Sequence, residues 1–292
     1  MNLKVPSPIE TLSDQWLNKA MYIKRDDLIH PIISGNKWRK IKGHLIHFKV
    51  HDYKKLLSVG SAHSNHLHAL SYVCKELNIP FKALIYGSYE SNKSHMISDL
   101  HQWQTEIEFI NRNQVTDFNY SENIFLDNNY FIPEGGKGEC SEVGLKELLN
   151  ELPSNFDQPN NAIIIPCGSG TSLRGILNQS LAFRIFSFSP VKSMCNAIVH
   201  PRLHWLNDRA QMKFGGCNNS LIEFIFNFYE KEKILLDPIY NSRLFQLCVE
   251  NASEFKDFDQ IIYVNSGGAQ DWRPYFDRYP SAIKLKSIFD KY

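Results

Sequence analysis

Short apolar runs alternate along the chain with longer segments in which apolar residues recur at helical spacing. The short runs predict strands at Leu56–Val59, Phe81–Tyr86, Ile107–Ile110, Tyr130–Ile132, Ala162–Ile165, Arg184–Ser189 and Ile261–Val264. The longer segments predict helices at Leu67–Leu77, His95–Gln104, Glu142–Leu152, Thr171–Gln179, Leu221–Lys231 and Ser242–Phe255. Strands that alternate with helices in this way are typical of the α/β class with parallel sheets.

The loops that follow three of these strands carry polar residues together with glycine. In parallel sheets, ligands bind at the carboxyl ends of the strands. The loops after Val59, Ile165 and Val264 combine glycine with serine, asparagine or threonine. We therefore expect the functional site to be built from these loops.

Length and composition narrow the class of protein. The 292 residues exceed one typical domain, so we expect two domains around a cleft. A net charge of +1 without a basic run argues against a nucleic-acid partner and favours a small substrate. No apolar stretch is long enough for a membrane helix, and the start of the chain does not resemble a signal peptide. The six cysteines stand singly, as is typical of a cytoplasmic protein.

The segment Gly168-Ser169-Gly170-Thr171-Ser172 lies between a predicted strand and a predicted helix. Glycines let the backbone approach a ligand, hydroxyls supply hydrogen bonds, and the following helix presents free N–H groups, so the segment could bind a phosphate. It is neither a P-loop nor a regular dinucleotide fingerprint. The alternative is an ordinary tight turn with a helix cap.

Two further segments carry candidate chemistry. Lys37 follows Gly35-Asn36, where a loop enters a helix. This position would lower the pKa of the Lys37 amine and favour Schiff-base chemistry. The alternative is a solvated basic helix face that includes Lys24, Arg25, Arg39, Lys40 and Lys42. Ser64 and Asn65 precede a predicted helix and suit a carboxylate, or simply cap that helix. A zinc site at His63, His66 and His68 lacks the usual ligand spacing.

Two segments are unremarkable when each is taken alone. Tyr240, in Asp237-Pro238-Ile239-Tyr240-Asn241, could project from the start of a helix or pack in the core. Asn265-Ser266-Gly267-Gly268 could be a plain turn.

Taken together, the segments resemble the 1-aminocyclopropane-1-carboxylate deaminase and D-cysteine desulfhydrase family. These are pyridoxal 5′-phosphate (PLP) enzymes with the tryptophan-synthase-β-like fold, also called PLP fold type II. The matching segments occur in family order: Lys24–Leu28, Gly35–Lys40, Ser64–His66, Pro133–Gly136, Gly168–Ser172, Asp237–Tyr240 and Ser266–Gly268. They span nearly the whole chain, and one cofactor would account for most of them.

The resemblance implies a role for each matching residue. Lys37 would hold PLP as a Schiff base, and Lys40 would reach its phosphate together with Gly168, Ser169, Gly170, Thr171 and Ser172. Asn65 would contact the phenolic oxygen of PLP, and Ser266, with Asn241, the pyridine nitrogen. Ser64 would bind the substrate carboxylate and assist proton transfer, and Tyr240 would stand over the ring. No metal is implied.

The resemblance also predicts the domain organisation: residues 1–40 and 151–292 would form a larger PLP-binding domain, and residues 41–150 a smaller α/β domain, with the cofactor cleft between two parallel sheets. We expect a cytoplasmic homodimer. The sequence departs from the deaminases at two positions. Asn241 stands where they have a glutamate, and Phe214 stands where a second tyrosine is expected.

These departures favour one reaction. With Asn241 and Ser266 both uncharged, nothing obvious keeps the pyridine nitrogen protonated, and a weaker electron sink suffices for β-elimination of a thiol. We therefore expect D-cysteine desulfhydrase-like elimination that yields a 2-oxo acid and ammonia. The alternatives are deamination by ring opening, β-replacement, or a catalytically inactive PLP-binding protein. A nucleotide-dependent oxidoreductase would need an acidic residue after Arg184–Ser189, and none is present.

Overall fold

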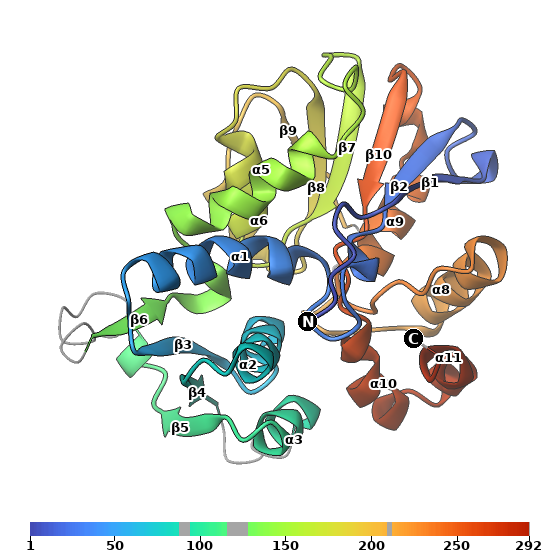
Figure 1. Ribbon diagram of the computed structural model, residues 1–292. Helices are drawn as coiled ribbons and strands as arrows, with labels where there is room; N and C mark the ends of the chain where they lie inside the picture. The colour runs from blue at the N-terminus through green and yellow to red at the C-terminus, as the bar shows by residue number, and fades with distance from the viewer. Residues whose placement is uncertain (88–93, 116–127, 209–211, 292) are drawn as a thin grey trace. The chain divides into compact units, whose positions relative to one another are not determined.

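The computed structural model describes residues 1–87, 94–115, 128–208 and 212–291 (Figure 1). The chain divides into two compact units, which are described separately. The first unit comprises Met1–Leu3 and Asn36–Glu147, and the second comprises Lys4–Gly35 and Leu148–Tyr292. The predicted domain boundaries at residues 40 and 150 stay a prediction.

The first unit contains a four-stranded sheet in the order β5-β4-β3-β6, and every neighbouring pair is parallel. The strands are β3 (Lys55–Ser61), β4 (Phe81–Tyr86), β5 (Glu106–Ile110) and β6 (Asn129–Ile132). Helices α2 (Asn65–Leu77) and α3 (His95–Gln102) lie within this unit, and α1 (Gly35–Val50) and α5 (Glu142–Asn150) lie mostly within it. Side chains from all four strands form one apolar cluster on the sheet: Val59, Leu84, Ile110 and Phe131.

Helix α2 illustrates how local sequence fixes the ends of an element. The Ser64 hydroxyl accepts a hydrogen bond from the Leu67 backbone N–H at 3.3 Å, which satisfies one of the free donors at the helix start. At the other end, Asn78 adopts the left-handed conformation and closes the helix. The apolar residues between them face the interior because they recur at helical spacing.

The second unit contains a six-stranded sheet in the order β1-β2-β10-β7-β8-β9. Its strands are β1 (Ile9–Leu12), β2 (Met21–Lys24), β7 (Asn161–Pro166), β8 (Arg184–Phe188), β9 (Leu203–Trp205) and β10 (Gln260–Val264). Its further helices are α6 (Thr171–Leu177), α7 (Lys192–Ala197), α8 (Asn219–Glu232), α9 (Asn241–Glu250), α10 (Arg273–Arg278) and α11 (Ile283–Phe289). Only the β1–β2 pair is antiparallel among the paired strands described.

Both faces of this sheet are buried. Successive residues of β7 point to opposite sides: Ile164 packs into a cluster with residues of α8 and α9, and Ile163 packs into another with residues of α6. Figure 1 shows α8 and α9 on one side of the sheet and α6 on the other. Burial on both faces explains why β7 is an uninterrupted apolar run rather than an alternating one.

The predicted α/β fold with two largely parallel sheets is confirmed. Among the described residues, no helix combines the length and the apolar character that a bilayer span requires.

Candidate active site

In the second unit, two of the predicted ligand loops leave the sheet at the same edge. Strands β7 and β10 are parallel neighbours, with Tyr263 opposite Ile164. The loop Gly168–Ser172 follows the end of β7, and the turn Asn265–Gly268 follows the end of β10. Polar groups of two distant sequence segments are therefore gathered at the carboxyl edge of one sheet, where α/β proteins bind ligands.

The Gly168–Ser172 loop presents a set of hydroxyl groups. Gly170 has a φ of +80°, a conformation that favours glycine, and α6 begins at the next residue. The hydroxyl oxygens of Ser169 and Thr171 lie 3.1 Å apart. Within the described residues, the buried hydroxyl of Ser172 has no hydrogen-bond partner. An ordinary turn would leave this hydroxyl unexplained, whereas an oxygen-rich ligand would satisfy it.

Tyr240 lies directly before α9, and its ring faces the same loop. A Cβ atom built at Gly168 would lie 3.4 Å from Cε1 of Tyr240, so the loop backbone lies close to this ring. Burial, with a smaller contribution from the nearby carboxylates, raises the pKa of the Tyr240 phenol, which therefore stays protonated. The exposed ring of Phe214 packs edge-on against Tyr240, with 6.3 Å between the ring centroids.

Asp237 holds this turn in place. Its carboxylate accepts hydrogen bonds from the backbone N–H groups of Ile239, Tyr240 and Asn241, at 2.9, 2.7 and 2.8 Å. It also accepts one from the side-chain amide of Asn241. The carboxylate therefore caps α9 and fixes both candidate residues of this segment, and burial raises its pKa.

Asn241 is completely buried and contacts the turn after β10. Its Nδ2 lies 3.1 Å from the Gly267 carbonyl oxygen and 3.3 Å from the Ser266 hydroxyl, and its Oδ1 accepts a hydrogen bond from the Ser266 backbone N–H at 3.2 Å. The structure thus brings the predicted residues Asn241 and Ser266 into direct contact, close to Tyr240 in the chain.

The chain segment that leads to Lys37 packs on the same turn. A Cβ atom at Gly35 would lie 1.7 Å from the Ser266 carbonyl oxygen, and one at Gly267 would lie 1.7 Å from the Ser34 hydroxyl. Ser34 also accepts a hydrogen bond from the Gly268 N–H at 3.1 Å. Two glycines at positive φ are therefore needed for these backbones to approach one another.

In the first unit, Ser64 and Asn65 lie at the start of α2, after β3. The predicted cap is present, and it uses the Ser64 oxygen as an acceptor. The next residue, His66, is buried with its Nε2 3.2 Å from the Ser58 hydroxyl, and a Cβ at Gly136 would lie 3.2 Å from its ring. Burial and the neighbouring Lys40 lower the pKa of His66, so its ring is neutral.

The basic residues near Lys37 do not form a solvated helix face. Lys24, Arg25, Arg39 and Lys40 are all buried, so this alternative is wrong. Lys24 donates hydrogen bonds to Ser7 and Glu151 in the second unit and has a structural role. Lys40, in α1, is 4% exposed, whereas Lys37 is half-buried with its Nζ 2.6 Å from Asn36 Oδ1.

The three histidines considered for zinc have separate environments. His66 contacts Ser58, His68 is 2.7 Å from the Asp99 carboxylate, and His63 is exposed. Among the described residues, no group of three or more potential ligands could hold a metal ion.

No protein-family model matches this chain. A protein from Pyrococcus horikoshii that is named after 1-aminocyclopropane-1-carboxylate deaminase is 24% identical over 95% of this chain and 94% of its own length. D-cysteine desulfhydrase from Serratia proteamaculans is 21% identical over 90% of this chain and 91% of its own length. The predicted resemblance is confirmed. The names of these relatives agree with the predicted enzyme class.

Structural similarity supports the same fold. The crystal structure of a homologue of 1-aminocyclopropane-1-carboxylate deaminase superposes with a TM-score of 0.80, covering 97% of this chain and 95% of the other at 22% identity. The predicted fold class is confirmed by this likeness.

The residues present fit PLP. The hydroxyls of the Gly168–Ser172 loop suit a phosphate, and the unpartnered Ser172 hydroxyl calls for an acceptor. Glycine at position 168 keeps a side chain away from the Tyr240 ring, which a Cβ atom there would approach to 3.4 Å. Apart from the zinc site considered for His66, neither Asp237 nor His66 had a predicted role of its own. The role of Asp237 could have been suspected from the sequence, because an aspartate shortly before a helix often caps it. Nothing in the sequence indicated that His66 would be buried against Gly136.

Proposed function

We propose that this protein is a PLP-dependent enzyme that eliminates a thiol from a small amino acid, with D-cysteine as the substrate to test first. The observation that carries the proposal is the set of polar groups at the carboxyl edge of the second unit's sheet. The Gly168–Ser172 hydroxyls, Tyr240 and Ser266 lie on segments that contact one another or share this edge. The resemblance to the deaminases and desulfhydrases supplies the class of reaction.

The proposed cofactor contacts follow the predicted residues. Lys37 would bind PLP covalently, Lys40 and residues Gly168–Ser172 would hold its phosphate, Asn65 its phenolic oxygen and Ser266 its pyridine nitrogen. When bound, PLP would accept the electron pair released at the substrate α-carbon. Asn241 would act through Ser266, because its own amide is occupied by Asp237 and by the turn after β10.

The side chains of this chain suit the remaining tasks. The Ser64 cap uses only the oxygen as an acceptor, so the hydroxyl proton stays available for a substrate carboxylate. The amine of Lys37, or Ser64, would remove the α-proton once substrate has displaced the lysine. Tyr240, kept as a neutral phenol by burial, would lie near the substrate and hold no charge against it. The C–S bond would then break, and hydrolysis would yield a 2-oxo acid and ammonia.

The cofactor assignment is tested by borohydride reduction and peptide mapping. The purified protein should absorb visible light, and reduction should fix the cofactor on Lys37. Lys37→Ala should lose the absorbance. Lys42→Ala is the matched control, because Lys42 lies on the same helix but pairs with Glu147 at a partly exposed site. A label on another lysine would refute the assignment.

The substrate is tested on one preparation, by sulfide release from D-cysteine and by 2-oxobutanoate formation from 1-aminocyclopropane-1-carboxylate. We expect sulfide to predominate. Predominant 2-oxobutanoate would favour a deaminase. If the protein carries PLP and a screen of D- and L-amino acids gives no 2-oxo acid, it is the inactive binding protein. We also propose a cytoplasmic homodimer, which cell fractionation and sedimentation would test.

A further inference from the structure

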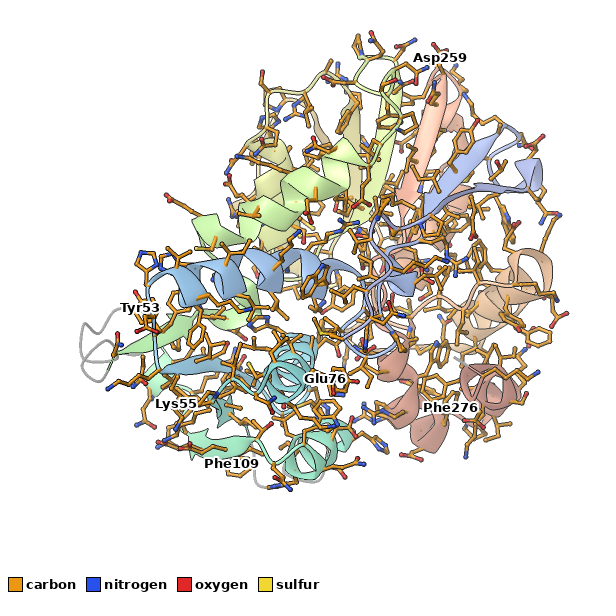
Figure 2. The ribbon with its side chains drawn as sticks, in the orientation of Figure 1. Tyr53, Lys55, Glu76, Phe109, Asp259 and Phe276 are labelled. Carbon is orange, nitrogen blue, oxygen red and sulfur yellow. The ribbon has the colours of Figure 1, made fainter. Side chains whose placement is uncertain are left out.

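A hydrogen-bond relay in the first unit joins strands β6 and β3 to helix α2. The hydroxyl of Ser58, in β3, donates to the Ile132 carbonyl oxygen at 2.8 Å, and His66 Nε2 lies 3.2 Å from the same hydroxyl oxygen. A hydroxyl has one proton and a carbonyl oxygen can only accept, so the Ser58 proton is used on Ile132. His66 must therefore donate from Nε2. Figure 2 labels Lys55, the first residue of β3, and Glu76, near the end of α2.

The relay leaves the other ring nitrogen of His66 with a lone pair. Burial and the neighbouring charge of Lys40 lower the pKa of His66, so the neutral ring carries one proton, and that proton lies on Nε2. Nδ1 is consequently an acceptor. His66 is 3% exposed, and among the described residues its Nδ1 has no hydrogen-bond partner. A buried acceptor without a donor is costly, so a donor that can reach Nδ1 will be drawn to it.

Lys40, in α1, faces the same glycine as His66 Nδ1. A Cβ atom built at Gly136 would lie 3.4 Å from Nδ1 of His66 and 3.3 Å from Cβ of Lys40. His44, one turn after Lys40, holds this glycine in place, because its Nε2 lies 3.3 Å from the Gly136 carbonyl oxygen. After burial, the charge of Lys40 is the strongest influence that lowers the pKa of His66. The flexible stem of lysine and its three N–H donors make Lys40 the group suited to Nδ1.

We infer that His66 is a positioning residue for Lys40: Ser58 fixes the His66 proton on Nε2, and the Nδ1 lone pair accepts one proton of the Lys40 ammonium, which leaves the others for a bound phosphate. The inference rests on the proposed function, in which Lys40 holds the phosphate of PLP. The opposite tautomer would set an N–H donor against the ammonium and turn it away. Ser58 therefore controls the direction of a cation that it does not touch.

The first measurement is the tautomer of His66, read by NMR from protein labelled with ¹⁵N-histidine. In the wild type, the shifts should show a protonated Nε2 and an unprotonated Nδ1, and PLP should move Nδ1 to the shift of a hydrogen-bonded nitrogen. Ser58→Ala removes the acceptor at Nε2 and should place part of the proton on Nδ1. His68 is the internal reference, because it lies on the same helix with its Nε2 2.7 Å from the Asp99 carboxylate. Its tautomer should not change.

The second measurement compares the affinity for PLP with the affinity for pyridoxal, which lacks the phosphate. His66→Gln keeps a donor for Ser58 but has no acceptor in the place of Nδ1. It should lower the ratio of PLP affinity to pyridoxal affinity about five- to tenfold, the usual effect of one lost hydrogen bond. His66→Asn puts an amide oxygen near the place of Nδ1 and should keep most of the ratio, although it loses the bond to Ser58. A purely structural role would not separate the two variants.

Ser58→Ala should also lower the ratio, and it provides a second variant if His66→Gln does not fold. Ser71→Ala is the matched control. Ser71 is buried in the same helix, and its hydroxyl shares a hydrogen bond with the Thr105 hydroxyl, outside the relay. This variant loses a comparable hydrogen bond and should keep the wild-type ratio and the wild-type tautomer of His66.

The outcomes separate the inference from the proposed function. If borohydride reduction finds no PLP on Lys37, the proposed function fails, and the inference fails with it. If PLP is on Lys37 but His66 carries its proton on Nδ1, only the inference is overturned. The same holds if His66→Gln keeps the wild-type ratio, or if Gln and Asn at position 66 lower it equally. A ratio that falls as far in Ser71→Ala as in Ser58→Ala would mean that general loosening of α2 is the cause, which also overturns the inference.

Discussion

Gly267 offers a direct test of the close packing between the segment that precedes Lys37 and the turn after β10. In Gly267→Ala, the new Cβ would lie 1.7 Å from the Ser34 hydroxyl oxygen. Rotation of Ser34 would leave its Cβ at 3.0 Å and would lose the hydrogen bond from Gly268. The φ of +79° costs a residue with a Cβ about 1–2 kcal/mol, and overpacking adds about 1–3 kcal/mol. We expect a loss of about 2–5 kcal/mol.

Gly215→Ala is the matched control for this prediction. Its φ of +67° imposes a similar backbone cost, but the nearest atom to a new Cβ is 3.7 Å away. Urea unfolding of both variants isolates the steric contribution as the difference between them, about 1–3 kcal/mol. Ser34→Gly should rescue Gly267→Ala, because it removes both clashing atoms at a position whose φ is itself positive. Equal losses in the two alanine variants, or no rescue, would refute the argument.

Three further predictions follow from other contacts. Thr171→Glu should weaken PLP binding at least tenfold in a titration, since a buried carboxylate would repel the phosphate, and Thr171→Val should weaken it less. Lys24→Met should cost about 3–5 kcal/mol in urea unfolding, because it removes the buried cation that lies 2.5 Å from the Glu151 carboxylate. Burial lowers the pKa of His44 to about 4, so the unfolded chain takes up a proton below pH 6.5 that the folded chain refuses. Stability should fall as the pH drops from about 6.5 to 4, and His44→Gln should reduce this loss by up to about 3 kcal/mol.

Most strands could be predicted because their apolar runs are bounded by turn residues. The run at Phe81–Tyr86 matches β4 at both ends, and Ala162–Ile165 lies within β7. Strands β1, β2 and the three-residue β9 were not predicted. β1 is a four-residue edge strand with two adjacent polar residues at its centre, and β2 is only four residues long and ends on a lysine. The lysine is buried only because Ser7 and Glu151 solvate it, and such pairing across the fold leaves no local signal.

The start of α1 was predicted at Gly35-Asn36, but not its 16-residue length. Its sequence, GNKWRKIKGHLIHFKV, places cations on positions that the structure buries, so the usual division into a polar and an apolar face is absent. Buried Arg39 and Lys40 could not be distinguished from a solvated face by periodicity alone. The site residues were predicted from motifs, whose order along the chain carries information that local pattern does not.

Position 241 shows why a motif and a contact network must be read together. The motif alone invites the interpretation that an uncharged residue faces the cofactor and weakens it as an electron sink. In the structure, the side-chain amide of Asn241 is instead hydrogen-bonded to Asp237, Gly267 and Ser266. The absence of a carboxylate then has a local cause, because a second acid beside the buried Asp237 would be costly. The missing charge at position 241 is therefore explained by packing in the protein itself and is not evidence for thiol elimination.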